Sequence, residues 1–204
     1  MVTMREAAQG LYGAYRLARL DAAGMQAFDV SIEGYWRSFG AALVALPGYL
    51  VVVALRASQA PEEEGWLRFV AIEAIAYVIA WVAYPLAAFY LTRPLNRADR
   101  YVAYIVAYNW SNVLQLAVYV AVVIVAASNL APLALVGVLH LATVLTVLAY
   151  QWFIARTALA ITPLAAAGIV FLDFVIGFLV NSVGLTLHRV GITVPIDAVV
   201  AAIG

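Results

Sequence analysis

The chain contains no cysteine and no lysine, and charged residues make up only 11% of its 204 positions. Without cysteine, disulfides, thiolate nucleophiles and thiolate metal sites are excluded. Hydrophobic residues account for 67% of the chain, whereas an ordinary soluble domain has roughly 45 to 50%. So few charges could not cover a water-facing surface without large apolar patches. The composition therefore excludes a soluble globular protein, and the net charge of zero argues against a nucleic-acid partner.

The sequence instead contains several long apolar runs. A helix needs roughly 20 mostly apolar residues to cross the hydrocarbon core of a bilayer. Runs of that length occupy residues 35–55, 66–91, 101–127, 132–154 and 162–187. The connections between them are short, which leaves no room for an extramembrane domain. We therefore predict an all-α, polytopic membrane protein with five transmembrane helices in one bundle, in direct contact with the lipid bilayer.

The arginines sort unequally between the two ends of this bundle. The end that carries the N-terminus holds eight of them, namely Arg5, Arg16, Arg19, Arg37, Arg93, Arg97, Arg100 and Arg156. The other end holds three, Arg56, Arg68 and Arg189, beside the acidic residues 62–64. Because cytoplasmic loops carry an excess of basic residues, we predict a bacterial inner membrane protein with a cytoplasmic N-terminus and a C-terminus outside.

The first 30 residues predict an amphipathic interfacial helix followed by a hinge. Thr3 and Glu6 match a capping box at its start. An apolar stripe recurs at helical spacing over Met4, Ala7, Ala8, Leu11, Ala14, Tyr15 and Ala18. The helix can lie in the headgroup region, or it can dock on the loops of the protein itself. The predicted organisation is thus residues 1–30 as helix and hinge, 31–189 as the bundle and 190–204 as a short far-side tail.

Polar residues inside the spans fall on particular helix faces. Seven residues of the third span share an arc of about 100°, namely Tyr101, Tyr104, Tyr108, Ser111, Asn112, Gln115 and Tyr119. We expect this face to point into the bundle, because polar groups facing lipid would lack partners. Together with matching faces on the other spans it predicts an intramembrane polar network of Glu73, Tyr108, Asn112, Gln115, His140, Asp173 and Asn181.

The residue types of this network leave its role open. It can be a satisfied set of hydrogen bonds that fixes helix register, or a path for protons or a solute, because acid, imidazole and carboxamide groups at similar depth suit a relay. Small residues beside it, such as Gly137, Gly177 and Gly184, predict close helix approach. The His and carboxylate positions show no metal-ligand spacing, so no metal is expected.

Motifs for catalysis are absent from the sequence. It contains no glycine-rich phosphate loop, no nucleophile elbow and no paired-histidine metalloprotease helix. We therefore expect neither enzymatic activity nor a cofactor.

Two regions of the chain are similar to a known family. One is the charged loop that leads into a tyrosine-rich span, with Arg97, Arg100, Tyr101, Tyr104 and Tyr108. The other is the turn after the fourth span, with Gln151, Arg156, Thr157, Ala158, Leu159 and Ala160. With the five short-looped spans, they resemble the Ypt/Rab-interacting membrane proteins and their bacterial relatives. This resemblance implies a nonenzymatic membrane protein that acts through protein or lipid contacts.

Two functions are compatible with these observations. The first is an interaction, scaffold or accessory-subunit protein that presents a basic surface to lipid, to a protein partner or to a second copy of itself. That surface comprises Arg5, Arg16, Arg19, Arg93, Arg97 and Arg100. The alternative is a small-solute or proton-coupled transporter that uses the polar network. A dry, fully paired network favours the scaffold, whereas an accessible central cavity favours transport.

Overall fold

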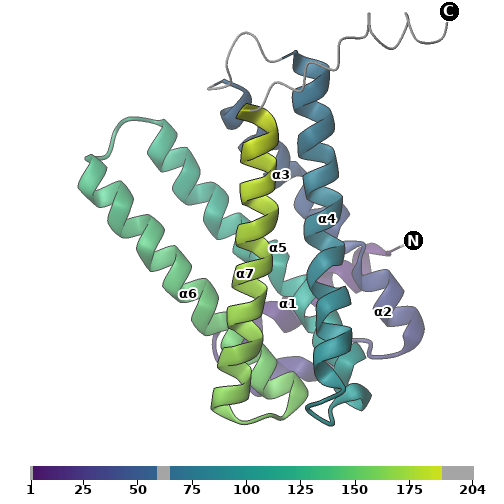
Figure 1. Cartoon of the computed structure of the whole chain (residues 1–204). Coiled ribbons are helices and arrows are strands. Elements are labelled where there is room, and N and C mark those ends of the chain that lie inside the picture. The colour runs from purple at the N-terminus through teal and green to yellow at the C-terminus, as the bar shows by residue number, and fades with distance from the viewer. Residues whose placement is uncertain (1, 59–64, 190–204) are drawn as a thin grey trace, which may run out of the picture.

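The computed structural model describes residues 2–58 and 65–189. The predicted acidic loop at 62–64 and the predicted tail at 190–204 lie outside these residues. The elements are α1 (Met4–Ala18), η1 (Ala22–Ala27), α2 (Ile32–Ser38), α3 (Ala41–Ala57), α4 (Trp66–Thr92), η2 (Ala98–Arg100), α5 (Tyr101–Ala127), α6 (Leu133–Leu159) and α7 (Pro163–Arg189). Figure 1 shows their arrangement.

The described chain is helical, and five of its segments are long and apolar enough to cross a membrane. They are Ile32–Ala57, Trp66–Thr92, Ala98–Ala127, Leu133–Leu159 and Pro163–His188. The predicted all-α fold with five spans is confirmed. The fourth span is longer than predicted, because Ala155, Ala158 and Leu159 continue the helix and are buried in the core.

The first span consists of two helices that meet at Phe39 and Gly40. Here the Gly40 N–H donates to the Arg37 carbonyl, three residues back, which is the tighter pattern of a 3₁₀ turn. A side chain at Gly40 would collide with the N-terminal segment, because its Cβ would lie 2.2 Å from Val2 Cγ2. The break therefore lets the chain before α1 pass close to the membrane span.

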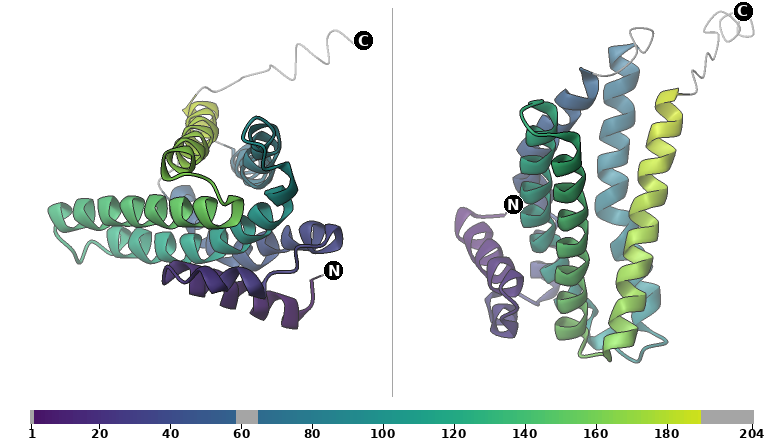
Figure 2. Two further views of the ribbon diagram at one scale, coloured as in Figure 1. Left: turned by 90° about the horizontal axis from the view of Figure 1, so that it is seen from below. Right: turned by 90° about the vertical axis from the view of Figure 1, so that its left-hand side faces the viewer.

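The helices form three layers, which Figure 2 shows from two directions. α1 and η1 lie on one side, α2, α3, α5 and α6 form the middle layer, and α4 and α7 lie on the other side. α5 is the central helix, and the eight consecutive residues from Tyr104 to Ser111 are all buried. We call the end formed by the α4–α5 and α6–α7 connections the Arg-rich end, because it carries Arg93, Arg97, Arg100 and Arg156.

α1 begins where the sequence predicts. The Thr3 hydroxyl accepts from the Glu6 N–H at 3.2 Å, and the Glu6 carboxylate accepts from the Thr3 N–H at 2.8 Å. The predicted capping box is therefore confirmed. The predicted apolar stripe of α1 is right only in part: Ala14 is buried and Ala7 and Leu11 pack against the core, but Met4 and Tyr15 are exposed. The other buried residues are Gly10, Gly13 and Leu17, which the stripe did not include.

The glycines of α1 explain which face of the helix is buried, because they allow it to pack closely on its neighbours. A Cβ on Gly10 would lie 2.3 Å from the Trp110 ring of α5, and one on Gly13 would lie 2.9 Å from Phe28. The Tyr150 hydroxyl of α6 donates to the Ala14 carbonyl at 2.6 Å. α1 thus docks on helices α5 and α6 at the depth of Trp110, rather than on the loops of the protein.

Ion pairs connect polar side chains of residues 2–38, which we call the N-terminal unit. Arg37 of α2 bridges Glu6 at 2.7 Å and Asp29 at 2.8 Å. Arg16 pairs with Asp21 at 2.6 Å. The pKa of Asp21 is lowered, first by the hydrogen bond from Arg16 and then by the one from the Ala23 N–H. These pairs link α1, the following turn and α2.

Candidate functional site

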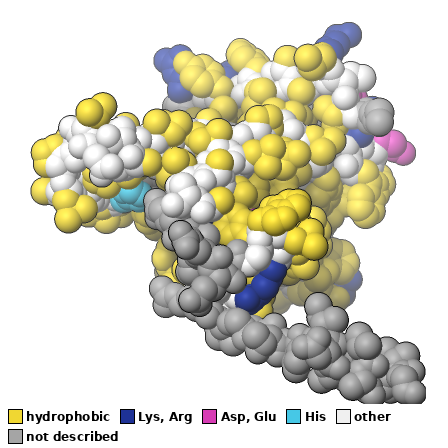
Figure 3. Space-filling view, turned by 90° about the horizontal axis from the view of Figure 1, so that it is seen from above, with side chains coloured by type: hydrophobic (Ala, Val, Ile, Leu, Met, Phe, Trp, Pro, Cys, Tyr) yellow, Lys and Arg dark blue, Asp and Glu magenta, His cyan; other side chains and the backbone are white. Residues whose placement is uncertain are grey.

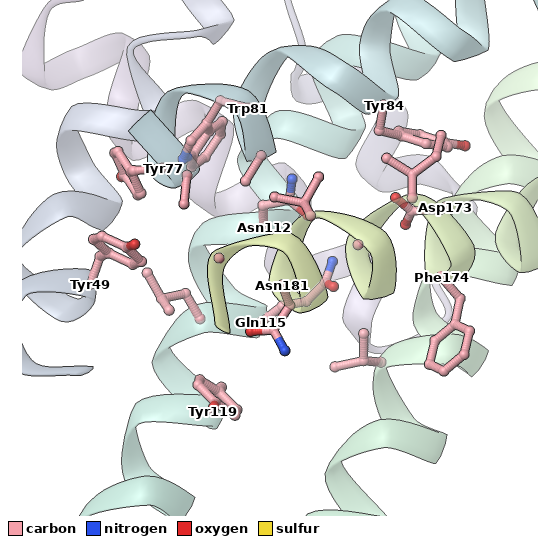
Figure 4. A pocket seen from close by; sticks show the side chains of 18 of the residues that line it. Tyr49, Tyr77, Trp81, Tyr84, Asn112, Gln115, Tyr119, Asp173, Phe174 and Asn181 are labelled. Atoms are coloured by element: carbon pink, nitrogen blue, oxygen red, sulfur yellow. The ribbon is translucent and has the colours of Figure 1, made fainter. Parts of the chain in front are cut away.

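A cavity of about 520 Å³ lies among α3, α4, α5, α6 and α7. It extends from Asp173 and Tyr84, near the middle of the bundle, to Arg56 and His188 at the end opposite the Arg-rich end. Figure 4 shows part of its lining, with Asn112, Gln115 and Asn181 between the aromatic groups. Figure 3 views the molecule from that opposite end, where hydrophobic side chains dominate the visible surface.

Tyrosines close the cavity toward the Arg-rich end. Tyr108 of α5 donates to Asp173 Oδ1 of α7 at 2.8 Å. The Tyr108 ring packs on Tyr84 of α4, with centroids 4.6 Å apart, and the Tyr84 hydroxyl is hydrogen-bonded to that of Tyr104. Nearer the Arg-rich end, the Tyr101 hydroxyl donates to the Pro85 carbonyl at 3.0 Å. These contacts join α4, α5 and α7 into a floor below Asp173.

Carboxamides line the middle of the cavity. Gln151 of α6 donates from Nε2 to Asn112 Oδ1 at 3.3 Å and to Gln115 Oε1 at 3.2 Å. Gln115 Nε2 has no hydrogen-bond partner among the described residues. Asn181 of α7 also lines the cavity. The amide layer is therefore only partly satisfied by the protein itself.

A buried carboxylate lies at the end of the cavity near Arg56 and His188, which we call the mouth. The Glu73 side chain is only 4% exposed. It accepts from the Tyr49 hydroxyl at 2.6 Å and pairs with Arg56 at 3.2 Å, both from α3, and with His188 of α7 at 3.3 Å. Arg56 therefore neutralises Glu73, and the cluster ties α3, α4 and α7 together.

The predicted network splits into three groups. Tyr108 and Asp173 form the floor, Asn112 and Gln115 the amide layer, and Glu73 the mouth, while Asn181 lines the cavity between floor and mouth. The inward direction of this face of α5 agrees with the structure.

His140 is a correction to the predicted network. Its Nδ1 lies 2.9 Å from the Val136 carbonyl, one turn back in α6. It is not among the residues that line the cavity. His140 shares a face of α6 with Thr143, Val144 and Val147, which line the cavity, but it lies farther toward the end at which α6 diverges from α7, beyond the cavity (Figure 1).

The small residues of α6 and α7 are a second correction. A Cβ added at Gly137, Gly177 or Gly184 would meet nothing within 4 Å. These glycines therefore do not mediate close helix approach. Gly177 and Gly184 instead widen the cavity, which they line.

The sequence missed Arg56, Tyr49 and Tyr84 as site residues. Arg56 was assigned to a surface loop, yet α3 continues to Ala57 and brings it within reach of Glu73. The signal that could have found it is the tendency of a buried carboxylate to need a cationic partner. Tyr84 carried a weaker signal, since it shares a helix face with Glu73 and Tyr77.

The predicted basic surface divides into exposed and engaged arginines. Arg5, Arg19, Arg93 and Arg100 are exposed, and the Arg93 guanidinium lies 4.4 Å from the Phe89 ring centroid. Arg16 and Arg97 are half-buried, with Arg16 paired to Asp21 and Arg97 donating to the Ala160 carbonyl at 3.3 Å. The predicted basic surface therefore combines exposed guanidinium groups with half-buried ones that contact the protein itself.

The described residues contain no cluster of three or more His, Asp or Glu side chains that could hold a metal. An acidic residue at the centre of a membrane helix costs about 2.5 to 3.5 kcal/mol on insertion scales. Glu73, nearer the end of its span, is paired with Arg56, whereas Asp173 has, among the described residues, only the Tyr108 hydroxyl as a partner. Retaining such a residue points to a role for the cavity.

Comparisons with known proteins returned no matching family model, no matching curated protein and no matching solved structure. The fold and the site therefore define the class: a five-span membrane protein with a partly polar cavity among helices α3 to α7.

Proposed function

We propose that this chain is a nonenzymatic membrane protein that binds a small amphipathic molecule in its cavity, as the binding step of solute transport. The observation that carries the proposal is the 520 Å³ space that reaches from one end of the bundle to Asp173. Small-molecule sites have volumes of about 300 to 1,000 Å³ and combine apolar walls with a few polar groups. Of the two functions that the sequence left open, an accessible cavity favours transport.

The walls of the cavity suit a ligand with an apolar part. Figure 1 shows α6 and α7 joined at the Arg-rich end and diverging toward the other end. On the cavity side α6 contributes Val144 and Leu148, and α7 contributes Phe174 and Val180. An apolar chain can occupy this space while a polar group contacts the amides and Asp173.

The polar groups support binding rather than catalysis. Glu73 is held by Arg56, Tyr49 and His188, so it is committed to a structural cluster. Asp173 accepts from Tyr108, a hydroxyl that is itself buried. These groups can recognise and orient a solute.

We propose in addition that the Arg-rich end faces the cytoplasm of a bacterial inner membrane, because of the eight-to-three division of arginines. Since the chain has no cysteine, single cysteines at Asp99 and Asn129 mark the two ends cleanly. In intact cells, an impermeant maleimide should label Asn129→Cys and spare Asp99→Cys. The reverse pattern would overturn the orientation.

The binding proposal is tested with a pair of glycines on α7. Gly177 lines the cavity and Gly168 does not, and a Cβ at either meets nothing within 4 Å. The probe is the neutral fluorophore N-phenyl-1-naphthylamine, whose emission rises in an apolar site, added to protein in nanodiscs. Gly177→Trp should remove the saturable component of the signal, while Gly168→Trp retains it. Equal signals from both folded variants would contradict the proposal.

An accessory-subunit role is the second candidate, favoured by the exposed apolar side chains along α6 and α7, such as Leu141, Leu145 and Phe178. A partner helix or a second copy of the chain can cover them, as kinship with the Ypt/Rab-interacting proteins would imply. Cross-linking of Phe178→Cys to another chain in native membranes, together with no saturable probe binding, would favour this role.

A further inference from the structure

The two carboxylates of the cavity have different electrostatic surroundings. No Arg or His nitrogen lies within 4 Å of Asp173 in the described part of the chain, whereas Glu73 has both Arg56 and His188 within that distance. Asp173 Oδ1 accepts from Tyr108, and Oδ2 has no hydrogen-bond partner among the described residues. An ionised Asp173 therefore presents a negative charge that no described side chain neutralises.

Arg56 is too far away to neutralise Asp173. It pairs with Glu73, which precedes Tyr84 by eleven positions on α4. At about 1.5 Å per residue, this is a separation of roughly 16 Å along the helix axis. Tyr84 packs on Tyr108, the partner of Asp173. The mouth of the cavity is thus neutralised, while its floor carries the unpaired acid.

Aromatic rings surround the approach to Asp173. The Tyr84 and Tyr108 rings lie at the floor, and Trp81 and Tyr77 continue the same wall of α4 toward the mouth. Figure 4 shows Tyr84 beside Asp173, with Trp81 and Tyr77 at the far side of the cavity. Rings attract organic cations through their electron-rich faces, most strongly where water is excluded.

We propose that the ligand of this cavity is an amphipathic organic cation, with its charge beside Asp173 and its apolar part against the aromatic wall. This inference rests on the proposed function and names its ligand class. A single carboxylate with adjacent rings fits a diffuse ammonium or phosphonium charge. The carboxamides of Gln115 and Asn112, which line the cavity, then contact polar substituents of the ligand.

The test uses two ions of nearly equal size and shape but opposite charge, tetraphenylphosphonium and tetraphenylborate. Each is titrated against bound N-phenyl-1-naphthylamine in nanodiscs. Tetraphenylphosphonium should displace the probe at a concentration at least about tenfold lower than tetraphenylborate, because only the cation pairs with Asp173.

Single variants test whether Asp173 causes the preference for the cation. Asp173→Asn keeps an oxygen that can accept from Tyr108, so the floor is preserved while the charge is lost. It should weaken displacement by tetraphenylphosphonium at least about tenfold. Asp99→Asn, which removes an exposed carboxylate outside the cavity, should change nothing. Asp173→Glu should retain most of the preference for the cation. Thermal unfolding confirms that each variant is folded.

The outcomes separate the two proposals. If both ions displace the probe equally and Asp173→Asn has no effect, the cavity binds amphipathic molecules and the cation inference is overturned. If wild type and Gly177→Trp show the same signal with every probe, the proposed function fails as well. Selective displacement by the cation that is lost in Asp173→Asn supports both.

Discussion

Glycine has opposite effects in two parts of the molecule. We call the N-terminal unit with the part of α5 on which it packs the packed half, and the helices around the cavity the cavity half. In the N-terminal unit, Gly10 and Gly13 bring α1 so close to its neighbours that a Cβ would overlap Trp110 or Phe28. In the other half, Gly177 and Gly184 face open space. The first half is thus packed for stability, and the second retains a cavity.

Under the proposed function, this difference separates the part of the fold that is tightly packed from the part that binds a ligand. The packed half places Ser111, Asn109 and Tyr150 in a buried hydrogen-bonded core, with Asn109 Nδ2 donating to Ser38 at 2.9 Å. Buried amide atoms without a partner among the described residues occur in both halves, at Asn109 Oδ1 and at Gln115 Nε2, but only Gln115 lines a cavity. Functional sites commonly keep such locally unfavourable features at a cost in stability.

The largest expected effect comes from placing the same substitution in both halves. Gly10→Ala puts a methyl group where the Trp110 ring lies, so we expect a loss of about 2 to 3 kcal/mol in unfolding free energy. Gly177→Ala meets nothing and gains helix propensity, up to about 1 kcal/mol. Thermal unfolding in detergent measures both changes. Similar effects at the two positions would remove the distinction between the halves.

A second substitution checks the cause of the first. If Gly10→Ala acts through the ring, Trp110→Leu should cost less stability in the Gly10→Ala background than in wild type, because the smaller side chain makes room for the methyl group. Additive losses would show that the contact between Gly10 and Trp110 is not responsible.

The local features of this fold could be predicted from the sequence. The Thr3 and Glu6 cap and the five spans depend on residues that are close together in the chain. The pairs that shape the two halves could not be predicted, because Gly10 with Trp110 and Arg56 with Glu73 depend on how helices rotate against one another. His140 shows the same limit, since the depth and face of a residue on its own span do not tell how far that span diverges from its neighbours (Figure 1).

The next effect concerns the mouth of the cavity. Glu73→Ala leaves Arg56, Tyr49 and His188 without their shared acceptor, which costs 3 to 5 kcal/mol for a fully buried pair. The Arg56 side chain is 39% exposed, so we expect about 2 kcal/mol. Glu73→Gln keeps an acceptor for Tyr49 and should lose roughly half as much. No loss in thermal stability for Glu73→Ala would show that the cluster does not hold the mouth together.

The smallest effect is at the exposed edge of the packed half. The pKa of Asp21 is lowered by the hydrogen bond from Arg16, so its contribution to stability is present above the ordinary aspartate pKa and is lost as pH falls through the lowered value. Asp21→Asn should therefore reduce the melting temperature slightly at about pH 7, and by less at about pH 3. A difference that grows on acidification would contradict this sign.

Labelling of two adjacent residues tests the open cavity most directly. Gly177 and its neighbour Phe178 are both exposed and lie at almost the same depth, but Gly177 lines the cavity and Phe178 does not. Single cysteines at these positions are treated with a water-soluble maleimide in proteoliposomes. The cavity predicts that Gly177→Cys reacts at least about tenfold faster than Phe178→Cys, because thiols react as thiolates, which require water. Equally slow reaction of both would show that lipid covers Gly177 and that no accessible cavity exists.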